Sequence, residues 1–376
     1  MSGTVSGAAI LSGNTTDRSG ADWSVGEMEP EPEPDAADQA ASFEVVTVEE
    51  PQVDQYISVL HQEEVAEQPQ VDQYFDVPDL VPPENTMRYW SLPPTADARP
   101  NAIVLLVHGL GCAARDPAAG GFDQPQTRRL CRFGRVLAPD LFGHGGSALP
   151  RGEEPYRMRS QAAYLVQLLR HLRAEWVWLV GHSMGGPITV AVAEALTEAV
   201  TPKLCGVLYS EPNIDGSDCD GGSRRGLRSS EDLEAQWNDG ATVLAKLANA
   251  KLAYAACCRD LVRESDSGKL LPRMQTLRGH DGAGVLPSLC LIGSENRGMR
   301  TSEAALLACG FPVQYIEGAG HCQHLDNPEE FFAAADALFS AVAAGKSLVE
   351  AGVDPVAAVQ AETGPSEEAR RCRRAS

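Results

Sequence analysis

Basic residues are nearly absent from the first part of this 376-residue chain. Residues 1–85 contain nineteen Asp and Glu but a single cation, Arg18, so they carry a net charge of −18 out of −21 for the whole chain. An excess of negative charge repels phosphate backbones, and we therefore expect no binding to nucleic acid. The run EPEPEPD at Glu29–Asp35 has no apolar side chain to bury. We predict that residues 1–85 form a disordered acidic arm.

Long apolar runs, a secretory signal and ordered cysteine spacings are also missing. No window approaches the ~20 apolar residues of a membrane-spanning helix. The N-terminus, MSGTVSGAAILSGNTT, lacks the basic and apolar regions of a signal peptide. None of the ten cysteines falls in a CxxC or zinc-type spacing, which indicates reduced thiols. We therefore predict a cytoplasmic protein with no membrane span, no metal site and no cofactor.

A short repeat lies inside the acidic arm. Pro51–Tyr56 and Pro69–Tyr74 both read PQVDQY. Two copies of an acidic hexapeptide that ends in an aromatic residue fit a tandem motif for a protein partner. We favour the simpler interpretation, a duplicated low-complexity stretch, and keep the partner motif as the alternative.

Segments with strand and helix patterns alternate between residues 86 and 345. The strand candidates are Thr86–Leu92, Ala102–Val107, Arg135–Ala138, Trp176–Val180, Leu204–Tyr209, Leu289–Ile292 and Val313–Ile316, and the helix candidates are Gln161–Leu172, Pro187–Leu196 and a last helix that starts at Asn327. This alternation predicts an α/β fold with a mostly parallel sheet and helices on both faces. Between residues 212 and 286 no buried strand is evident, and Ser230–Leu261 has helical spacing, which predicts an inserted helical cap. We expect residues 346–376 to form a disordered tail.

The strongest chemical signal is the pentapeptide GHSMG at Gly181–Gly185. It follows the apolar run WVWLV and precedes a helix of small residues, which is the context of a nucleophile elbow. A sharp turn from strand to helix strains the backbone of the central residue and leaves no space for side chains two positions away. The pattern therefore predicts Ser183 as a catalytic nucleophile.

Two further motifs supply groups that a serine nucleophile needs. HGLG at His108–Gly111 follows the run AIVLLV, and its small residues let backbone N–H groups face the serine. The N–H groups of Leu110 and Met184 are the candidate oxyanion hole, and His108 is expected to orient the loop.

A histidine late in the chain is the candidate general base. GAGH at Gly318–His321 places a loop histidine after the last strand, in the order nucleophile, acid, histidine. We favour His321 over His324, because His324 lies closer to the helix that starts after Asn327 and is expected to pack there.

These motifs together resemble the α/β-hydrolase fold superfamily, in its branch of single-domain esterases, haloperoxidase-like enzymes and C–C-bond hydrolases. The resemblance runs from about Thr86 to Val342 and includes HGLG, PDLFGHGGS at Pro139–Ser147, GHSMGG at Gly181–Gly186 and GAGHCQHLDNPEEF at Gly318–Phe331. It implies Ser183 as nucleophile, His321 as base, and oxyanion N–H groups on Leu110 and Met184. It also implies that Asp140, His144 and Ser147 structure a loop.

The acid of the expected triad departs from the family pattern. Members usually place Asp three residues beyond the glycine that ends the penultimate strand, and here that position after Gly293 holds Asn296. An amide cannot stabilise an imidazolium by charge. Glu211 follows the preceding strand, where some members carry their acid, and Glu295 is adjacent to Asn296. We favour Glu211 and keep Glu295 as the alternative acid.

The predicted function is that of a serine hydrolase, an esterase-like enzyme that acts on a small ester, thioester, amide or C–C-bond substrate through an acyl-enzyme. The expected partner is therefore a small-molecule substrate, and Arg224, Arg225 and Arg228 of the cap favour one that bears a carboxylate. Two alternatives remain. One is an acyltransferase or lyase that uses the same triad. The other is a non-catalytic ligand receptor or interaction protein on a hydrolase scaffold, which Asn296 and the acidic arm keep open.

Overall fold

The computed structural model describes residues 72–82, 84–116, 120–199, 201–220, 222–227, 243–279 and 286–348. The predictions for the arm up to residue 71, which include the first PQVDQY copy, lie outside these residues. The same holds for the tail after residue 348 and for residues 228–242 of the predicted cap.

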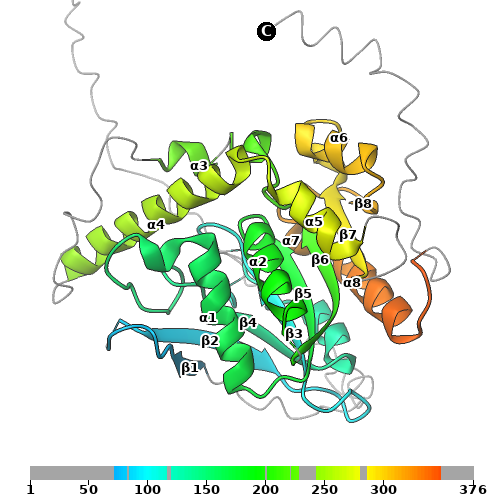
Figure 1. Cartoon of the computed structure of the whole chain (residues 1–376), viewed down its shortest axis with the longest axis horizontal. Coiled ribbons are helices and arrows are strands. Elements are labelled where there is room, and N and C mark those ends of the chain that lie inside the picture. The colour runs from blue at the N-terminus through cyan, green and yellow to red at the C-terminus, as the bar shows by residue number, and fades with distance from the viewer. Residues whose placement is uncertain are drawn as a thin grey trace, which may run out of the picture. The chain divides into compact units, whose positions relative to one another are not determined.

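Eight strands form one sheet in the order β1-β2-β4-β3-β5-β6-β7-β8 (Figure 1). Their bounds are β1 Gln73–Asp76, β2 Thr86–Leu92, β3 Ala102–Val107, β4 Arg135–Pro139, β5 Trp176–His182, β6 Lys203–Ser210, β7 Ser288–Gly293 and β8 Val313–Ile316. The pairs β1–β2 and β2–β4 are antiparallel, and the other pairs are parallel. The predicted mostly parallel sheet is therefore confirmed.

Helices cover both faces of this sheet. Their bounds are α1 Met158–His171, α2 Gly185–Thr197, α6 Thr301–Ala308, α7 Gln323–Asp326 and α8 Pro328–Ala343. One buried cluster joins α1 and α2 to the sheet and contains Leu105, whereas a second joins α8 to it and contains Leu106. Successive side chains of a strand point to opposite faces. The continuous apolar run of β3 therefore reflects a strand that is buried on both sides.

The described residues between β6 and β7 form helices and no strand. They are η5 Gly216–Cys219, α3 Gly222–Arg225, α4 Val243–Asp266 and α5 Leu270–Arg278. In Figure 1, α4 runs across the view above α1. Asp260 of α4 accepts a hydrogen bond from the backbone N–H of Met158 at 2.6 Å, and this bond joins α4 to the first turn of α1. None of the helices among the described residues is both long and apolar enough to span a membrane.

The start of the folded chain differs from the predicted boundary at residue 85. Gln73–Asp76 form β1, which pairs with β2 along the edge of the sheet. Phe75 is 5% exposed and packs into the core, whereas its neighbour Tyr74 is 59% exposed. The outward side chains are Tyr74 and Asp76, and the acidic composition of the surrounding segment hides the alternation, because charge counts do not separate the two sides of a strand. The second PQVDQY copy therefore ends inside β1.

This difference predicts unequal effects of two neighbouring substitutions. Phe75→Ala should lower the free energy of unfolding by about 3–5 kcal/mol, because it removes a buried ring from the core. Tyr74→Ala is the matched control and should change it by less than about 0.5 kcal/mol, since the ring is largely in solvent. Urea unfolding followed by tryptophan fluorescence measures both values. Equal and small effects of the two substitutions would contradict the burial of Phe75 and would favour the predicted boundary at residue 85.

Candidate active site

Ser183 lies at a strained turn between β5 and α2. Its backbone φ is 54°, in the left-handed region that residues with side chains rarely adopt. Close packing around the turn requires glycine at positions 181 and 185. A Cβ added to Gly181 would lie 2.3 Å from Thr189 Oγ1, and one added to Gly185 would lie 2.3 Å from the carbonyl oxygen of Val107. Neither position has space for a side chain, which is what the sharp turn of a nucleophile elbow requires.

The HGLG loop approaches this turn closely. A Cβ added to Gly109 would lie only 3.0 Å from the Cβ of Ser183. The backbone N–H groups of Leu110 and Met184 donate to no other residue in the described parts of the chain. Both donors therefore remain available beside Ser183 for an oxygen atom of a ligand.

His108 fixes the same loop through two hydrogen bonds. Its Nε2 accepts a hydrogen bond from the backbone N–H of Leu141 at 3.0 Å, so the ring proton must be on Nδ1. The Nδ1–H then donates to the carbonyl oxygen of Gly109 at 2.8 Å. Burial lowers the pKa of His108, which keeps the ring neutral and both hydrogen bonds intact.

Glu211 begins the turn after β6 and is 2% exposed. Its Oε1 accepts hydrogen bonds from the backbone N–H of Gly293 at 2.9 Å and from Asn296 Nδ2 at 3.1 Å. Its Oε2 lies 2.6 Å from Arg300 Nη1 and 3.6 Å from His321 Nδ1. The structure thus brings together the carboxylate and the histidine that the sequence placed in one triad.

The charge of this carboxylate is stabilised by its partners. Burial by itself raises the pKa of Glu211, but His321, Arg300, Asn296 and the Gly293 N–H together hold that pKa below its ordinary value. Asn296 occupies the position of the usual aspartate, and here its amide donates to Glu211 instead. The amide that cannot act as an acid is therefore a hydrogen-bond donor to the neighbouring acid.

The two alternative residues lie outside this group. Glu295 belongs to the short helix η7 Ser294–Asn296 and is exposed, and its carboxylate has no hydrogen bond or ion pair within the described ranges. His324 is buried, its ring packs 4.7 Å from the ring of Phe122, and its Nε2 donates to the Gly120 carbonyl at 3.1 Å. Burial lowers the pKa of His324 to about 4.

The hydroxyl of Ser183 donates to a residue that the sequence did not single out. Ser183 Oγ lies 3.2 Å from Asn213 Oδ1, and no hydrogen bond joins it to His321 within the described parts of the chain. His182 Nε2 instead donates to the His321 carbonyl at 2.9 Å, which ties the histidine loop to the elbow. Catalytic hydrogen bonds are often loose without substrate, so this arrangement is compatible with a Ser–His pair. One indication of a role for Asn213 is visible in the sequence, which is its position two residues after Glu211.

The loop at Pro139–Ser147 is organised by Asp140, as the family resemblance implied. The carboxylate of Asp140 accepts hydrogen bonds from Arg88 Nε at 2.6 Å and from the backbone N–H groups of Ala114 and Gly146 at 2.7 Å each. Ser147 Oγ donates to the Asp140 carbonyl at 2.6 Å, and His144 is buried beside this loop.

The cap arginines give little support to a carboxylate-bearing substrate. Arg224 is paired with Asp266 at 2.6 Å and with Asp220 at 2.9 Å, so its charge is already balanced. Arg225 lies at the end of α3, and Arg228 lies outside the described residues. In the described ranges no group of three or more His, Cys, Asp and Glu could hold a metal ion.

Comparisons with known proteins identify relatives of this arrangement. Residues 104–335 match the model of the alpha/beta hydrolase family. A putative carbamate hydrolase, RutD of Serratia proteamaculans (strain 568), is 33% identical over 132 residues, which are 35% of this chain and 43% of that protein. A 2-hydroxy-6-oxo-2,4-heptadienoate hydrolase of Pseudomonas putida is 38% identical over 90 residues, 24% of this chain and 31% of that protein. The chain thus spans less than half the length of these curated relatives.

Solved structures extend the match in three dimensions. A carboxylesterase structure from the thaumarchaeon Nitrososphaera gargenis superposes with a TM-score of 0.52 at 15% identity, over 73% of this chain and 100% of that one. At this identity the likeness shows the shared fold alone.

Four buried histidines around the site predict how stability depends on pH. Burial lowers the pKa of His144 to about 3 and of His324 to about 4, and it also lowers the pKa of His108 and His182. Below about pH 6.5 the unfolded chain therefore binds protons that the folded chain does not. The free energy of unfolding should therefore fall as the pH drops from about 6.5 towards 5. Each buried histidine contributes up to about 1.4 kcal/mol for each unit of pH. Denaturant unfolding at several pH values measures this slope. A flat profile in that window would contradict the buried, neutral state of these rings.

Proposed function

The chain belongs to the alpha/beta hydrolase family, and from this membership and the geometry around Ser183 we propose that it is a serine hydrolase. The observation that carries the proposal is the pairing of Glu211 with His321 Nδ1 at 3.6 Å, next to a serine in an elbow. A carboxylate at that nitrogen keeps the proton on Nδ1 and leaves Nε2 as the proton acceptor. The arrangement therefore supports a triad of Ser183, His321 and Glu211.

The proposed reaction is acyl transfer through a covalent intermediate. Ser183 Oγ leaves Asn213, turns to His321 and loses its proton as the oxygen attacks a carbonyl carbon. The N–H groups of Leu110 and Met184 bind the oxyanion, and such donors are typically worth ~2.7–4 kcal/mol each in barrier height. The imidazolium of His321 is stabilised by Glu211 and then protonates the leaving group. Water activated by His321 releases the acyl group and restores the free serine.

The substrate class follows from the fold and the relatives together. We propose a small carbonyl compound, such as an ester, thioester, amide or ketone with a cleavable C–C bond. The names of the relatives, a putative carbamate hydrolase and a hydrolase of 2-hydroxy-6-oxo-2,4-heptadienoate, support small carbonyl substrates. We propose that the helices between β6 and β7 cover the bound substrate and select among these compounds.

Removing the nucleophile tests the proposal directly. Ser183→Ala should lower kcat for a p-nitrophenyl ester by about 10⁴-fold or more, because the attacking oxygen is lost. The same change should abolish labelling by a fluorophosphonate probe. Ser340→Ala on α8 is the matched control and should keep both properties. A wild-type protein that is labelled slowly and releases no product would favour the receptor alternative, and transfer to an acceptor other than water would favour the acyltransferase alternative.

The choice between the two acids gives a second test. Glu211→Gln should lower kcat by about 10⁴-fold, because without the carboxylate the histidine adopts the wrong tautomer. Glu295→Gln, an exposed position two residues past Gly293, should have little effect and serves as the control. The reverse order would move the acid to Glu295. Equal and small effects would leave a Ser–His dyad or a protein without this catalytic function.

A further inference from the structure

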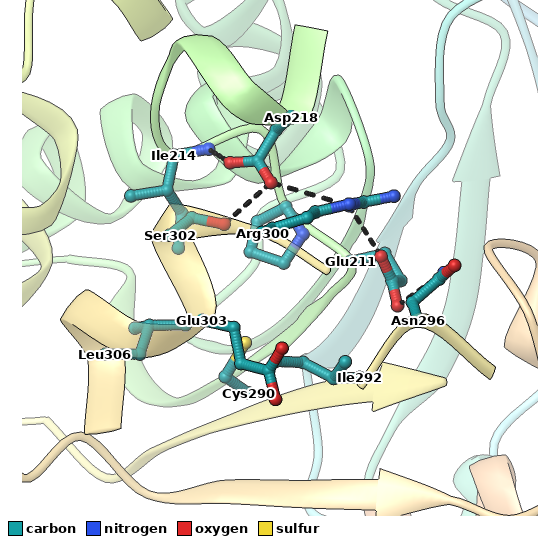
Figure 2. Close-up of a pocket in the computed structure, with 11 residues that line it drawn as sticks. Glu211, Ile214, Asp218, Cys290, Ile292, Asn296, Arg300, Ser302, Glu303 and Leu306 are labelled. Atoms are coloured by element: carbon teal, nitrogen blue, oxygen red, sulfur yellow. Dashed lines mark hydrogen bonds and ion pairs between the residues drawn. The ribbon is translucent and has the colours of Figure 1, made fainter. Parts of the chain in front are cut away.

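A guanidinium shares the same carboxylate oxygen that faces the candidate base. Arg300 Nη1 lies 2.6 Å from Glu211 Oε2 and 3.5 Å from Asp218 Oδ1. Figure 2 shows Arg300 between the two carboxylates, with Asn296 on the other side of Glu211. The side chains of Glu211 and Asp218 are each 1% exposed, whereas that of Arg300 is 22% exposed. Both carboxylates are buried away from bulk solvent, and the arginine is their shared counter-charge.

Asp218 is itself fixed by its neighbours. It belongs to η5, the first turn of the segment inserted between β6 and β7. Its Oδ2 accepts the backbone N–H groups of Ile214 at 2.7 Å and Asp215 at 3.0 Å, and its Oδ1 accepts Ser302 Oγ at 2.7 Å. Asp218 is therefore a rigid anchor from which Arg300 can be held.

The same inserted segment also reaches the nucleophile. Asn213 Oδ1 accepts a hydrogen bond from the Ser183 hydroxyl, and Asn213 Nδ2 donates one to the Asp218 carbonyl oxygen at 2.9 Å. One short stretch, residues 213–219, thus contacts Ser183 directly and Glu211 through Arg300. The beginning of the insertion is joined to both ends of the candidate triad.

We propose that Arg300 and Asp218 form a charge-balanced positioning pair for the triad acid: Arg300 orients the Glu211 carboxylate towards His321, and Asp218 anchors Arg300 and offsets its charge. The proposal rests on the function proposed above. Arg300 is a suitable positioning group, because a guanidinium is planar, remains charged and offers several donors in a fixed geometry. A glutamate has several side-chain torsions, and donors from three different segments hold this one in a single orientation.

The charges explain why two carboxylates accompany one arginine. Arg300 and Glu211 alone would form a neutral pair, and a neutral pair would stabilise an imidazolium at His321 only weakly. With Asp218 included, the group of three carries a net charge of −1 beside His321. Removal of Arg300 would therefore leave two uncompensated carboxylates, whereas removal of the Asp218 charge would leave a neutral pair beside His321.

Kinetics of four variants with a p-nitrophenyl ester test this pair. Arg300→Gln should lower kcat by about 100-fold with little change in KM, because a misplacement of a catalytic group by about 1 Å has an effect of that size. Arg300→Lys should recover part of kcat, since it restores the charge but not the planar geometry. Asp218→Asn should lower kcat less than Arg300→Gln. The double variant Arg300→Gln/Asp218→Asn should exceed Arg300→Gln in kcat, because it removes the second buried carboxylate and restores the net charge.

Arg297→Gln is the matched control, because Arg297 is exposed on the same loop and stacks on Tyr315, away from Glu211. Both ion pairs are already lost in Arg300→Gln, so the double variant differs from it only by the removal of the excess negative charge at Asp218. A double variant with kcat no higher than that of Arg300→Gln would therefore overturn the proposal. So would an effect of Arg300→Gln no larger than that of Arg297→Gln. If Glu211→Gln lowers kcat by about 10⁴-fold while Arg300→Gln leaves kcat at the level of Arg297→Gln, the pair is wrong and the triad stands. If Ser183→Ala keeps turnover, the proposed function itself fails.

Discussion

A carboxylate buried at the end of a strand has to be surrounded by donors and cations, and the candidate site is organised around this requirement at Glu211. Two hydrogen bonds come from the last residue of β7, Gly293, and from Asn296 in the turn that follows it. A cation comes from the residue before α6, and the histidine comes from the loop after β8. Removal of water without these partners would protonate the group and leave it without the charge that a base requires.

The parallel sheet places three of these segments next to one another. Ser183, Glu211 and Gly293 lie at the carboxyl ends of β5, β6 and β7, which are neighbours in the sheet. Carboxyl ends of parallel strands meet at one edge, and ligands bind there in open α/β sheets. The antiparallel strands β1 and β2 lie at the far edge of the same sheet and stabilise the fold away from the site.

Short sequence patterns predicted the strands, turns and helix starts that depend on local chain geometry. The apolar run of β3, the GHSMG motif and the cap residue Asn327 are each visible within a few consecutive residues, and the structure has the corresponding strand, turn and helix. The pattern missed β1, because this four-residue strand has a single buried apolar side chain, Phe75, within an acidic segment, and it missed α6, which has only eight residues. It also missed Arg300 and Asn213. Their contacts with Glu211 and Ser183 join segments that are distant in the chain, and no periodicity carries that information.

The hydrogen bond from Asn296 to Glu211 also bears on how such a site changes during evolution. The commoner family arrangement would place Asp at position 296, and that oxygen would stand about as close to Glu211 as the amide nitrogen does now, at 3.1 Å. Two buried carboxylates at that separation cannot both be ionised, so one would be protonated or displaced. A single substitution towards the common arrangement would therefore weaken the candidate acid Glu211 before an aspartate at position 296 could replace it. The two arrangements are separated by an intermediate that is worse than either, and an exchange requires positions 211 and 296 to change together.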